Sequence, residues 1–192
     1  MGAGATMLME SPRIRETERD AALVERCRAG DESAFSELLH LYRDKAVNLA
    51  YGVLGSAEDA QDAAQRAFIL VFMRLSDFRG ESAFFSWLYR IVINESINMS
   101  RGRPRTEVQY DAEIHDREDP RCNPNCREEV HIALRALPVH LRSVLVLREV
   151  DQLSYEEIAE VLRIPVGTVR SRLSSARSAF RRKYKELIRD EM

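Results

Sequence analysis

Arginine and hydroxyl side chains recur along the C-terminal part of the chain with spacings that suit the recognition of nucleic acid. From Arg163 to Arg189 there are nine Arg or Lys residues against one acidic residue. Arginine can pair bidentately with guanine in the major groove, and hydroxyls can donate to phosphates. Residues of these types are Thr168, Arg170, Ser171, Arg172, Ser174, Ser175 and Arg177, with Arg181, Arg182, Lys183 and Lys185 suited to backbone phosphates. The run predicts contact with a polyanion, although a solvated helix face gives a similar pattern.

The segment that carries these arginines has the organisation of a helix-turn-helix. Ser154 and Glu157 form a capping box, in which each side chain satisfies a free backbone N–H of the other residue. A short helix is then expected to Leu162, a turn over 163–165, and a long helix from about Val166 towards Ile188. The residues expected to fill the space between the two helices are Ile158, Leu162, Ile164, Val169 and Leu173. On its own, this pattern leaves open a repressor, a response-regulator output domain or a sigma factor.

The rest of the chain supplies the elements that must position this unit. Apolar residues at three- and four-residue spacings predict helices from Asp20 to Ala29, from Ser33 to Val53, from a Ser56 cap to Leu75, and from about Ser82 through Ile97. We predict an all-α fold of two small helical domains, residues 20–102 and 128–189. The linker at 103–127 is acidic, since eight acidic residues lie between Glu107 and Glu129 against three arginines.

Composition restricts the function classes. The 192-residue chain has a net charge of −2 and no apolar run that could span a bilayer. Its first ten residues do not resemble a signal peptide, so a cytoplasmic protein with no membrane insertion is expected. Four scattered histidines, no G-x-S-x-G and no glycine-rich phosphate loop argue against an enzyme. We therefore expect no catalytic residues, no metal and no cofactor.

The three cysteines suit neither a disulfide framework nor an obvious metal site. Cys27 fits a helical pattern as a small buried residue. Cys122 and Cys126, with His115 and His131 nearby, could supply four zinc ligands, but their spacing equally suits a turn at 123–125. A redox or metal role for this pair stays open.

Two groups of motifs, one in each predicted domain, carry a family resemblance. The first comprises Ala57-Glu58-Asp59-Ala60-Gln61-Asp62, Gln65-Arg66-Ala67-Phe68, Phe78-Arg79-Gly80-Glu81-Ser82-Ala83-Phe84 and Trp87-Leu88-Tyr89-Arg90-Ile91. The second comprises Leu153-Ser154-Tyr155-Glu156-Glu157-Ile158-Ala159 and Pro165-Val166-Gly167-Thr168-Val169-Arg170-Ser171-Arg172-Leu173. In this order they resemble regions 2 and 4 of the extracytoplasmic-function sigma factors of the sigma-70 family. No middle domain lies between them, which is typical of that group.

The resemblance implies a protein that binds core RNA polymerase, through its beta-prime clamp helices and beta flap, and initiates transcription at specific promoters. It places the clamp contacts on a group of residues that we call the polymerase set: Glu58, Asp59, Asp62, Gln65, Phe68, Ile69 and Phe72. Relatives usually carry Glu where this chain has Arg66. The resemblance also implies control by an anti-sigma factor. The alternative is a helix-turn-helix regulator that acts without joining the polymerase.

The same resemblance implies two promoter contacts, one to melted and one to double-stranded DNA. The −10 set, whose rings, amides and cations suit an unstacked single strand, is Phe85, Tyr89, Asn94, Asn98, Arg101 and Arg103. The −35 set is Thr168, Arg170, Ser171, Arg172, Ser175, Arg177 and Arg181. Many relatives have another basic residue where this chain has Ser174 and Ser175. Trp87 is expected to belong to the core instead.

Overall fold

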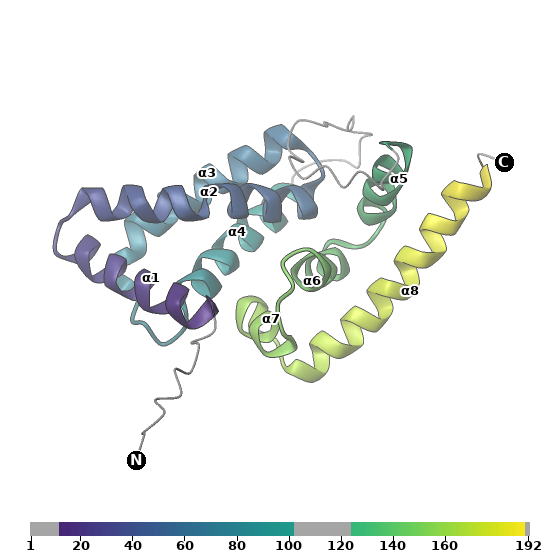
Figure 1. Cartoon of the computed structure of the whole chain (residues 1–192). Coiled ribbons are helices and arrows are strands. Elements are labelled where there is room, and N and C mark those ends of the chain that lie inside the picture. The colour runs from purple at the N-terminus through teal and green to yellow at the C-terminus, as the bar shows by residue number, and fades with distance from the viewer. Residues whose placement is uncertain (1–11, 102–123, 191–192) are drawn as a thin grey trace, which may run out of the picture.

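All regular secondary structure in the described part of the chain is helical. The computed structural model describes the backbone of residues 12–101 and 124–190, and the side chains of 16–101 and 128–189. Its elements are α1 (Pro12–Arg28), α2 (Glu32–Leu54), α3 (Ala57–Arg74), a 3₁₀ turn η1 (Leu75–Asp77), α4 (Phe84–Arg101), α5 (Pro124–Arg135), α6 (Val139–Glu149), α7 (Tyr155–Leu162) and α8 (Val166–Asp190). We call α1–α4 the N-terminal half and α5–α8 the C-terminal half (Figure 1). The predicted all-α fold is confirmed.

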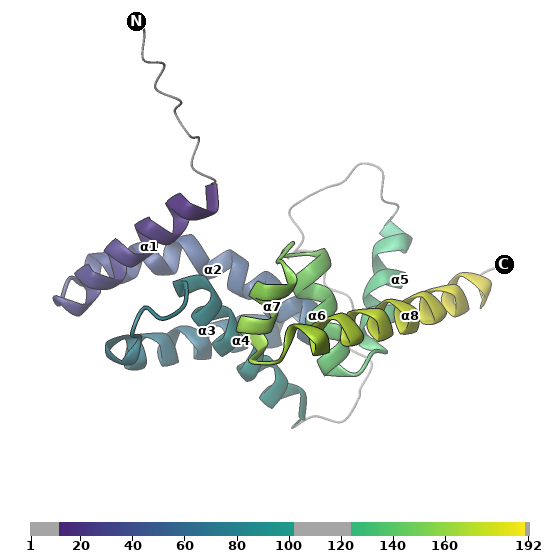
Figure 2. The same ribbon diagram turned by 90° about the horizontal axis from the view of Figure 1, so that it is seen from below.

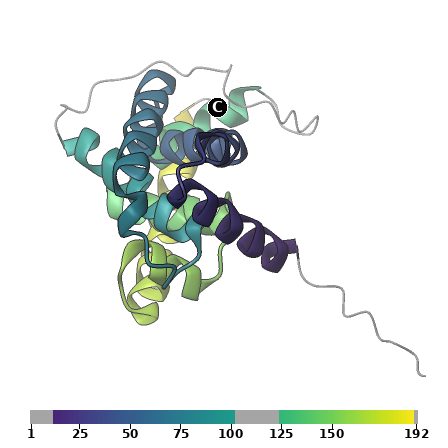
Figure 3. The ribbon, with the colours of Figure 1, turned by 90° about the vertical axis from the view of Figure 1, so that its left-hand side faces the viewer.

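Helix α2 is the centre of the N-terminal half, with α1, α3 and α4 packed around it. Figure 3 views α2 nearly end-on, with α1 and α3 on different sides of it. The side chain of Asp31 caps its start by accepting from the backbone N–H of Ser33 and Ala34, and Gly55 ends it with a φ of 72°. Helix α3 begins at the predicted Ser56 cap. Its fully buried alanines, Ala60, Ala63, Ala64 and Ala67, let neighbouring helices approach closely.

The C-terminal half contains the predicted helix-turn-helix. The capping box is confirmed: Glu157 N–H donates to Ser154 Oγ over 3.1 Å, and Ser154 N–H donates to Glu157 Oε2 over 2.6 Å. Arg163 ends α7 with a φ of 52°, the left-handed conformation common after a helix. Ile158, Val169 and Leu173 are buried between α7, α8 and α6, as expected, and Leu162 and Ile164 pack beside them. Helix α6 lies between α8 and the N-terminal half (Figure 1).

The two halves share a contact surface. Helix α6 packs on α2, and α7 packs on α4, and Figure 2 shows α4 and α7 beside each other from a second direction. One contiguous cluster of buried apolar residues runs through both halves. The sequence pattern favours a separate core in each half, whereas in this structure the two cores are joined.

Three element boundaries differ from the sequence-based expectations. Helix α1 begins at Pro12 instead of Asp20, α4 begins at Phe84 instead of about Ser82, and α5 begins at Pro124 instead of after the expected turn at 123–125. Proline is favoured at the first position of a helix, where its missing N–H costs nothing, so Pro12 and Pro124 mark starts.

The described residues give no sign of a membrane helix or a metal site. None of their helices is long and apolar enough to cross a bilayer, and no group of their His, Cys, Asp and Glu side chains could hold a metal ion. Cys122, His115 and the side chain of Cys126 lie outside the described residues. The redox or metal hypothesis for that pair stays a prediction.

Candidate interfaces for nucleic acid and protein

The first turns of α8 present the most accessible part of the −35 set. Arg170, Ser171, Ser175 and Arg181 are exposed, and Thr168 is half-buried. Ser171 Oγ donates to the Thr168 carbonyl over 3.0 Å, which fixes that hydroxyl on the helix. Because Val169, Leu173 and Ala176 on the opposite side are buried, the helix cannot rotate without losing its core contacts. This packing holds Arg170 outward.

Two other members of the −35 set contact other parts of the same chain. Arg177 Nη2 donates to Glu149 Oε1 over 2.8 Å, and this hydrogen bond raises the pKa of Arg177. Arg172 is half-buried and lines a pocket between the two halves. A DNA contact by Arg177 would have to compete with Glu149. The assignment of both residues to DNA stays a prediction.

The outer face of α3 carries the polymerase set and an apolar patch. Glu58, Asp62 and Gln65 are exposed. The patch consists of Ile69 at 52%, Phe72 at 63% and Met73 at 70% exposure. Large apolar side chains this accessible in a group mark a surface that another molecule covers. Met73 was missed by sequence reasoning, although its position four residues after Ile69 places it on the same helix face.

Two members of the polymerase set, Phe68 and Asp59, are buried in this structure. Phe68 is 8% exposed and Asp59 is 6% exposed. Phe68 belongs to the buried cluster, and the N–H of Asp59 donates to the capping oxygen of Ser56 over 3.4 Å. The side chains of both residues face the core in this structure, and their assignment to the polymerase contact stays a prediction.

The −10 set is divided along α4. Asn94, Asn98 and Arg101 are exposed, whereas Phe85 is half-buried and Tyr89 is buried. The rings of Phe85 and Tyr89 meet edge to face at 6.0 Å. Arg103 lies outside the described residues. Trp87 packs against Phe78 at 5.0 Å between ring centroids, which agrees with its expected core role.

The buried face of α4 meets the C-terminal half through polar groups. Tyr89 Oη donates to Asp151 Oδ1 over 3.2 Å. Ser86 Oγ donates to Glu160 Oε2 over 3.2 Å, and Arg90 Nη2 donates to the Glu160 carbonyl over 3.1 Å. Burial raises the pKa of Asp151 to about 6, while the Tyr89 hydrogen bond and the charge of Lys45 oppose that rise. Sequence reasoning gave no sign of these contacts.

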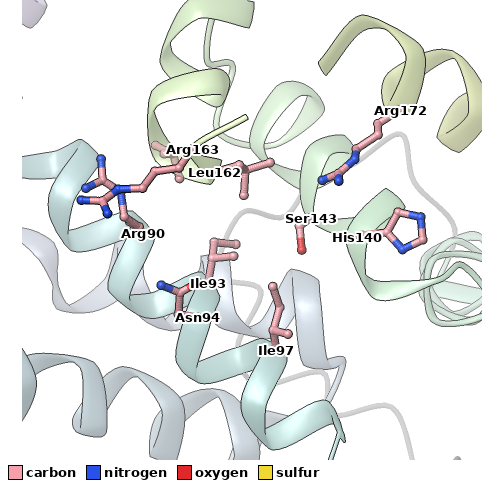
Figure 4. Close-up of a pocket in the computed structure, with 10 residues that line it drawn as sticks. Arg90, Ile93, Asn94, Ile97, His140, Ser143, Leu162, Arg163 and Arg172 are labelled. Carbon is pink, nitrogen blue, oxygen red and sulfur yellow. The ribbon is translucent and has the colours of Figure 1, made fainter. Parts of the chain in front are cut away.

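A pocket with a cationic rim lies beside this contact (Figure 4). Arg90, Ile93 and Asn94 of α4 line one wall, and Ser143 and Arg172 belong to the other half. Arg90 and Arg163 lie side by side, and Arg172 reaches in from the opposite side (Figure 4). Burial lowers the pKa of Arg90, and the neighbouring charge of Arg163 lowers it further.

Comparison with protein families gives two matches in chain order. The model described as Sigma-70 region 2 matches residues 38–106, which contain α4 and the exposed face of α3. The model described as Sigma-70, region 4 matches residues 127–180, which contain the helix-turn-helix.

Individual relatives and solved structures agree with these matches. The RNA polymerase sigma-H factor of Pseudomonas aeruginosa is 42% identical over 189 residues, covering 90% of this chain and 97% of that protein. The ECF RNA polymerase sigma-E factor of Escherichia coli K12 is 40% identical over 191 residues, covering 92% and 100%. CnrH, solved in complex with the cytosolic domain of CnrY, matches with a TM-score of 0.67 and 25% identity, covering 91% of this chain and 99% of CnrH. The sigma factor RpoE of Bartonella quintana, solved with the anti-sigma factor NepR, shares the fold with a TM-score of 0.65 and 22% identity, covering 79% and 96%. The chain therefore belongs to the sigma-70 family of RNA polymerase sigma factors, in its extracytoplasmic-function group.

Proposed function

We propose that this protein binds core RNA polymerase and directs promoter-specific transcription initiation by reading −35 and −10 elements. The observation that carries the proposal is the presence on one chain of two unlike exposed surfaces. The apolar patch on α3 suits a protein partner, and the outward arginine and hydroxyls of α8 suit a DNA groove. The α3 patch favours this function over a regulator that acts without polymerase, because such a regulator needs no polymerase-binding surface.

We further propose that the protein acts in the cytoplasm, without catalytic activity of its own, and that an anti-sigma factor controls it. CnrH was solved in complex with the cytosolic domain of CnrY, and the sigma factor RpoE was solved in complex with the anti-sigma factor NepR. The exposed α3 patch and the exposed face of α8 are the two surfaces that such a partner would have to cover. The division into domains at 20–102 and 128–189 stays part of this proposal.

Run-off transcription with core polymerase on a library of genomic fragments tests the proposed function. Transcripts that start at defined sites only when the protein is added are the expected result, and their upstream sequences give the two promoter elements. Failure to co-migrate with core polymerase in gel filtration, together with no specific transcripts, would favour a regulator that acts without polymerase.

Phe72→Asp is expected to weaken binding to core polymerase by about 10- to 100-fold, because a Phe side chain moved from water into an interface contributes about 1.5–3 kcal/mol. The helix itself should remain folded, since Phe72 is 63% exposed. Titration of labelled core polymerase measures the loss. Ile188→Asp, which changes an exposed apolar residue at the far end of α8, is the matched control and should bind normally.

Arg170→Ala is expected to weaken −35-dependent initiation while polymerase binding stays unchanged. Loss of a bidentate base contact costs about 1–3 kcal/mol, or about 5- to 150-fold, and relaxes the preference for one base. Run-off transcription from single-base variants of the −35 element measures both effects. Arg189→Ala removes the same charge near the end of α8 and should leave the preference intact. Equal loss on every −35 variant would reassign Arg170 to a phosphate contact.

A further inference from the structure

We propose that the pocket between the two halves binds a small organic anion with a phosphoryl group at one end and a carboxylate at the other. The phosphoryl group contacts Arg90 and Arg163, and the carboxylate contacts Arg172. The proposal goes beyond the proposed function and does not depend on it. Neither Arg90 nor Arg163 belongs to the polymerase set or to either promoter set, and binding of the anion is measured without polymerase or DNA.

The permanently charged residues that line this pocket are all cationic. The lining contains Arg90 of α4, Arg163 at the end of α7 and Arg172 of α8, and it contains no Asp or Glu. Within the described part of the chain, none of the three arginines forms an ion pair with a carboxylate. Like charges gathered at a partly buried site repel one another, and a bound anion offsets that repulsion. The pocket therefore favours a negatively charged ligand.

Arg90 and Arg163 form one cationic end of the pocket, where their side chains lie side by side (Figure 4). Arg90 Nη2 donates to the Glu160 carbonyl over 3.1 Å, which holds the guanidinium in place. The Nε–H group of Arg90 is buried and has no acceptor among the described residues. Burial and the charge of Arg163 lower the pKa of Arg90, while the charge of Glu160 opposes them. A phosphoryl group accepts several charge-assisted hydrogen bonds at once, so it suits this pair of guanidinium groups.

The other end of the pocket carries a single arginine, and the surface between the two ends is apolar. Arg172 reaches in from the side opposite to Arg90 and Arg163, and Ile93 and Leu162 lie between them (Figure 4). A ligand that contacts both ends therefore needs two anionic groups joined by a short carbon skeleton. One planar guanidinium can pair bidentately with one carboxylate, which assigns the carboxylate to the Arg172 end.

The size of the pocket limits the length of that skeleton. The pocket has a volume of about 190 Å³, whereas pockets for drug-sized ligands have about 300–1,000 Å³. The ligand can therefore have only a few carbon atoms. Its chemical class is a small phosphorylated carboxylic acid.

Isothermal titration calorimetry of the full chain with two matched probes tests the proposal, at an ionic strength of about 0.15 M. The probes are 3-phosphoglycerate and glycerol 3-phosphate, which differ only at one end, where the first has a carboxylate and the second a CH₂OH group. The unchanged protein should bind 3-phosphoglycerate about tenfold tighter than glycerol 3-phosphate. The reason is that a hydrogen bond between charged groups at a partly exposed site contributes roughly that factor.

Arg163→Gln and Arg172→Gln test the two ends of the pocket separately. Both substitutions keep a long polar side chain, and neither position is buried. Arg163→Gln should weaken the binding of both probes about tenfold, because both carry the phosphoryl group. Arg172→Gln should weaken the binding of 3-phosphoglycerate alone, and so remove its advantage over glycerol 3-phosphate.

Arg182→Gln is the matched control for these variants. Arg182 is an exposed arginine of α8 that does not line the pocket, so its substitution removes the same charge elsewhere. This variant should bind both probes as the unchanged protein does. Thermal unfolding gives a second readout. 3-Phosphoglycerate at ten times its Kd for the unchanged protein should raise the Tm of that protein by about 3–6 °C, and the Tm of Arg163→Gln by only about 1–2 °C.

Equal affinity of the unchanged protein for the two probes would overturn the proposal, because the arginines would then bind any phosphate, including those of DNA. Equal affinities of Arg163→Gln and Arg182→Gln for 3-phosphoglycerate would also overturn it, as would the absence of both binding heat and a Tm shift. If circular dichroism shows that Arg172→Gln does not fold, the two probes and the comparison of Arg163→Gln with Arg182→Gln decide the matter. Failure of the anion to bind leaves the run-off experiment unaffected. Binding as expected without promoter-specific transcription would reject the proposed function and keep the anion site.

Discussion

Replacing Arg142 by Met is expected to lower the free energy of unfolding by about 3 kcal/mol, because it removes the donor shared by three carbonyls. The Arg142 guanidinium donates to the carbonyl of Val53, to that of Arg135 over 2.6 Å and to that of Leu137 over 3.0 Å. Val53 lies in the last turn of α2 and Arg135 ends α5, so these carbonyls lack the partners that a longer helix would give. Arg142 caps both helix ends with one cation, which also suits their dipoles.

Thermal and urea unfolding measure this loss. For a chain of this size, about 3 kcal/mol corresponds to a Tm lower by about 6–12 °C. The Tm of Arg142→Lys should lie between that of the unchanged protein and that of Arg142→Met, because an ammonium group cannot span three acceptors as a planar guanidinium does. Arg43→Met, which changes an exposed arginine of α2, should have little effect. A Tm for Arg142→Met equal to that of Arg43→Met would mean that water replaces the guanidinium at all three carbonyls.

Features encoded within a few neighbouring residues were predictable from the sequence. The Ser154–Glu157 capping box and the Ser56 cap depend on contacts between residues three positions apart. The residue types at these positions are therefore enough to predict both caps. The buried side of the helix-turn-helix follows from helical spacing in the same way. The exposed α3 patch was partly predictable, because its members lie at helical intervals on a face otherwise polar.

The contact between the halves was not predictable from the chain alone. Tyr89 and Asp151 are 62 positions apart, and Arg142 and Val53 are 89 positions apart. Such pairs leave no local periodicity, and an arginine in an amphipathic helix is ordinarily a solvent-facing residue. Helical spacing places Phe68 and Phe72 four residues apart on α3, yet only the packed fold shows that the first is buried and the second exposed. Tertiary packing decided which side chains of each set reach the surface.

Asp151→Asn is expected to stabilise the folded protein by about 2–3 kcal/mol at pH 7.5. Burial raises the pKa of Asp151 from 3.8 to about 6, and each unit of difference between folded and unfolded chains corresponds to about 1.36 kcal/mol. The folded chain holds the Asp151 proton more tightly than the unfolded chain does. The carboxyl therefore favours folding below about pH 4, and that advantage is lost as the pH rises through about 6. Asparagine is neutral throughout and still accepts from Tyr89.

Urea unfolding at pH 7.5 and at pH 4.5 separates this effect from others. The gain of Asp151→Asn over the unchanged protein should be full at pH 7.5 and much smaller at pH 4.5, where Asp151 is protonated in the folded state. Asp44→Asn, an exposed acid of α2, should show no such difference between the two pH values. If Asp151→Asn were less stable than the unchanged protein at pH 7.5, the attraction between Lys45 and the Asp151 carboxylate would contribute more than burial of that carboxylate costs. Since the native carboxylate opposes its own burial near neutral pH, Asp151 makes the contact between α4 and the C-terminal half weaker than a neutral acceptor at the same place would.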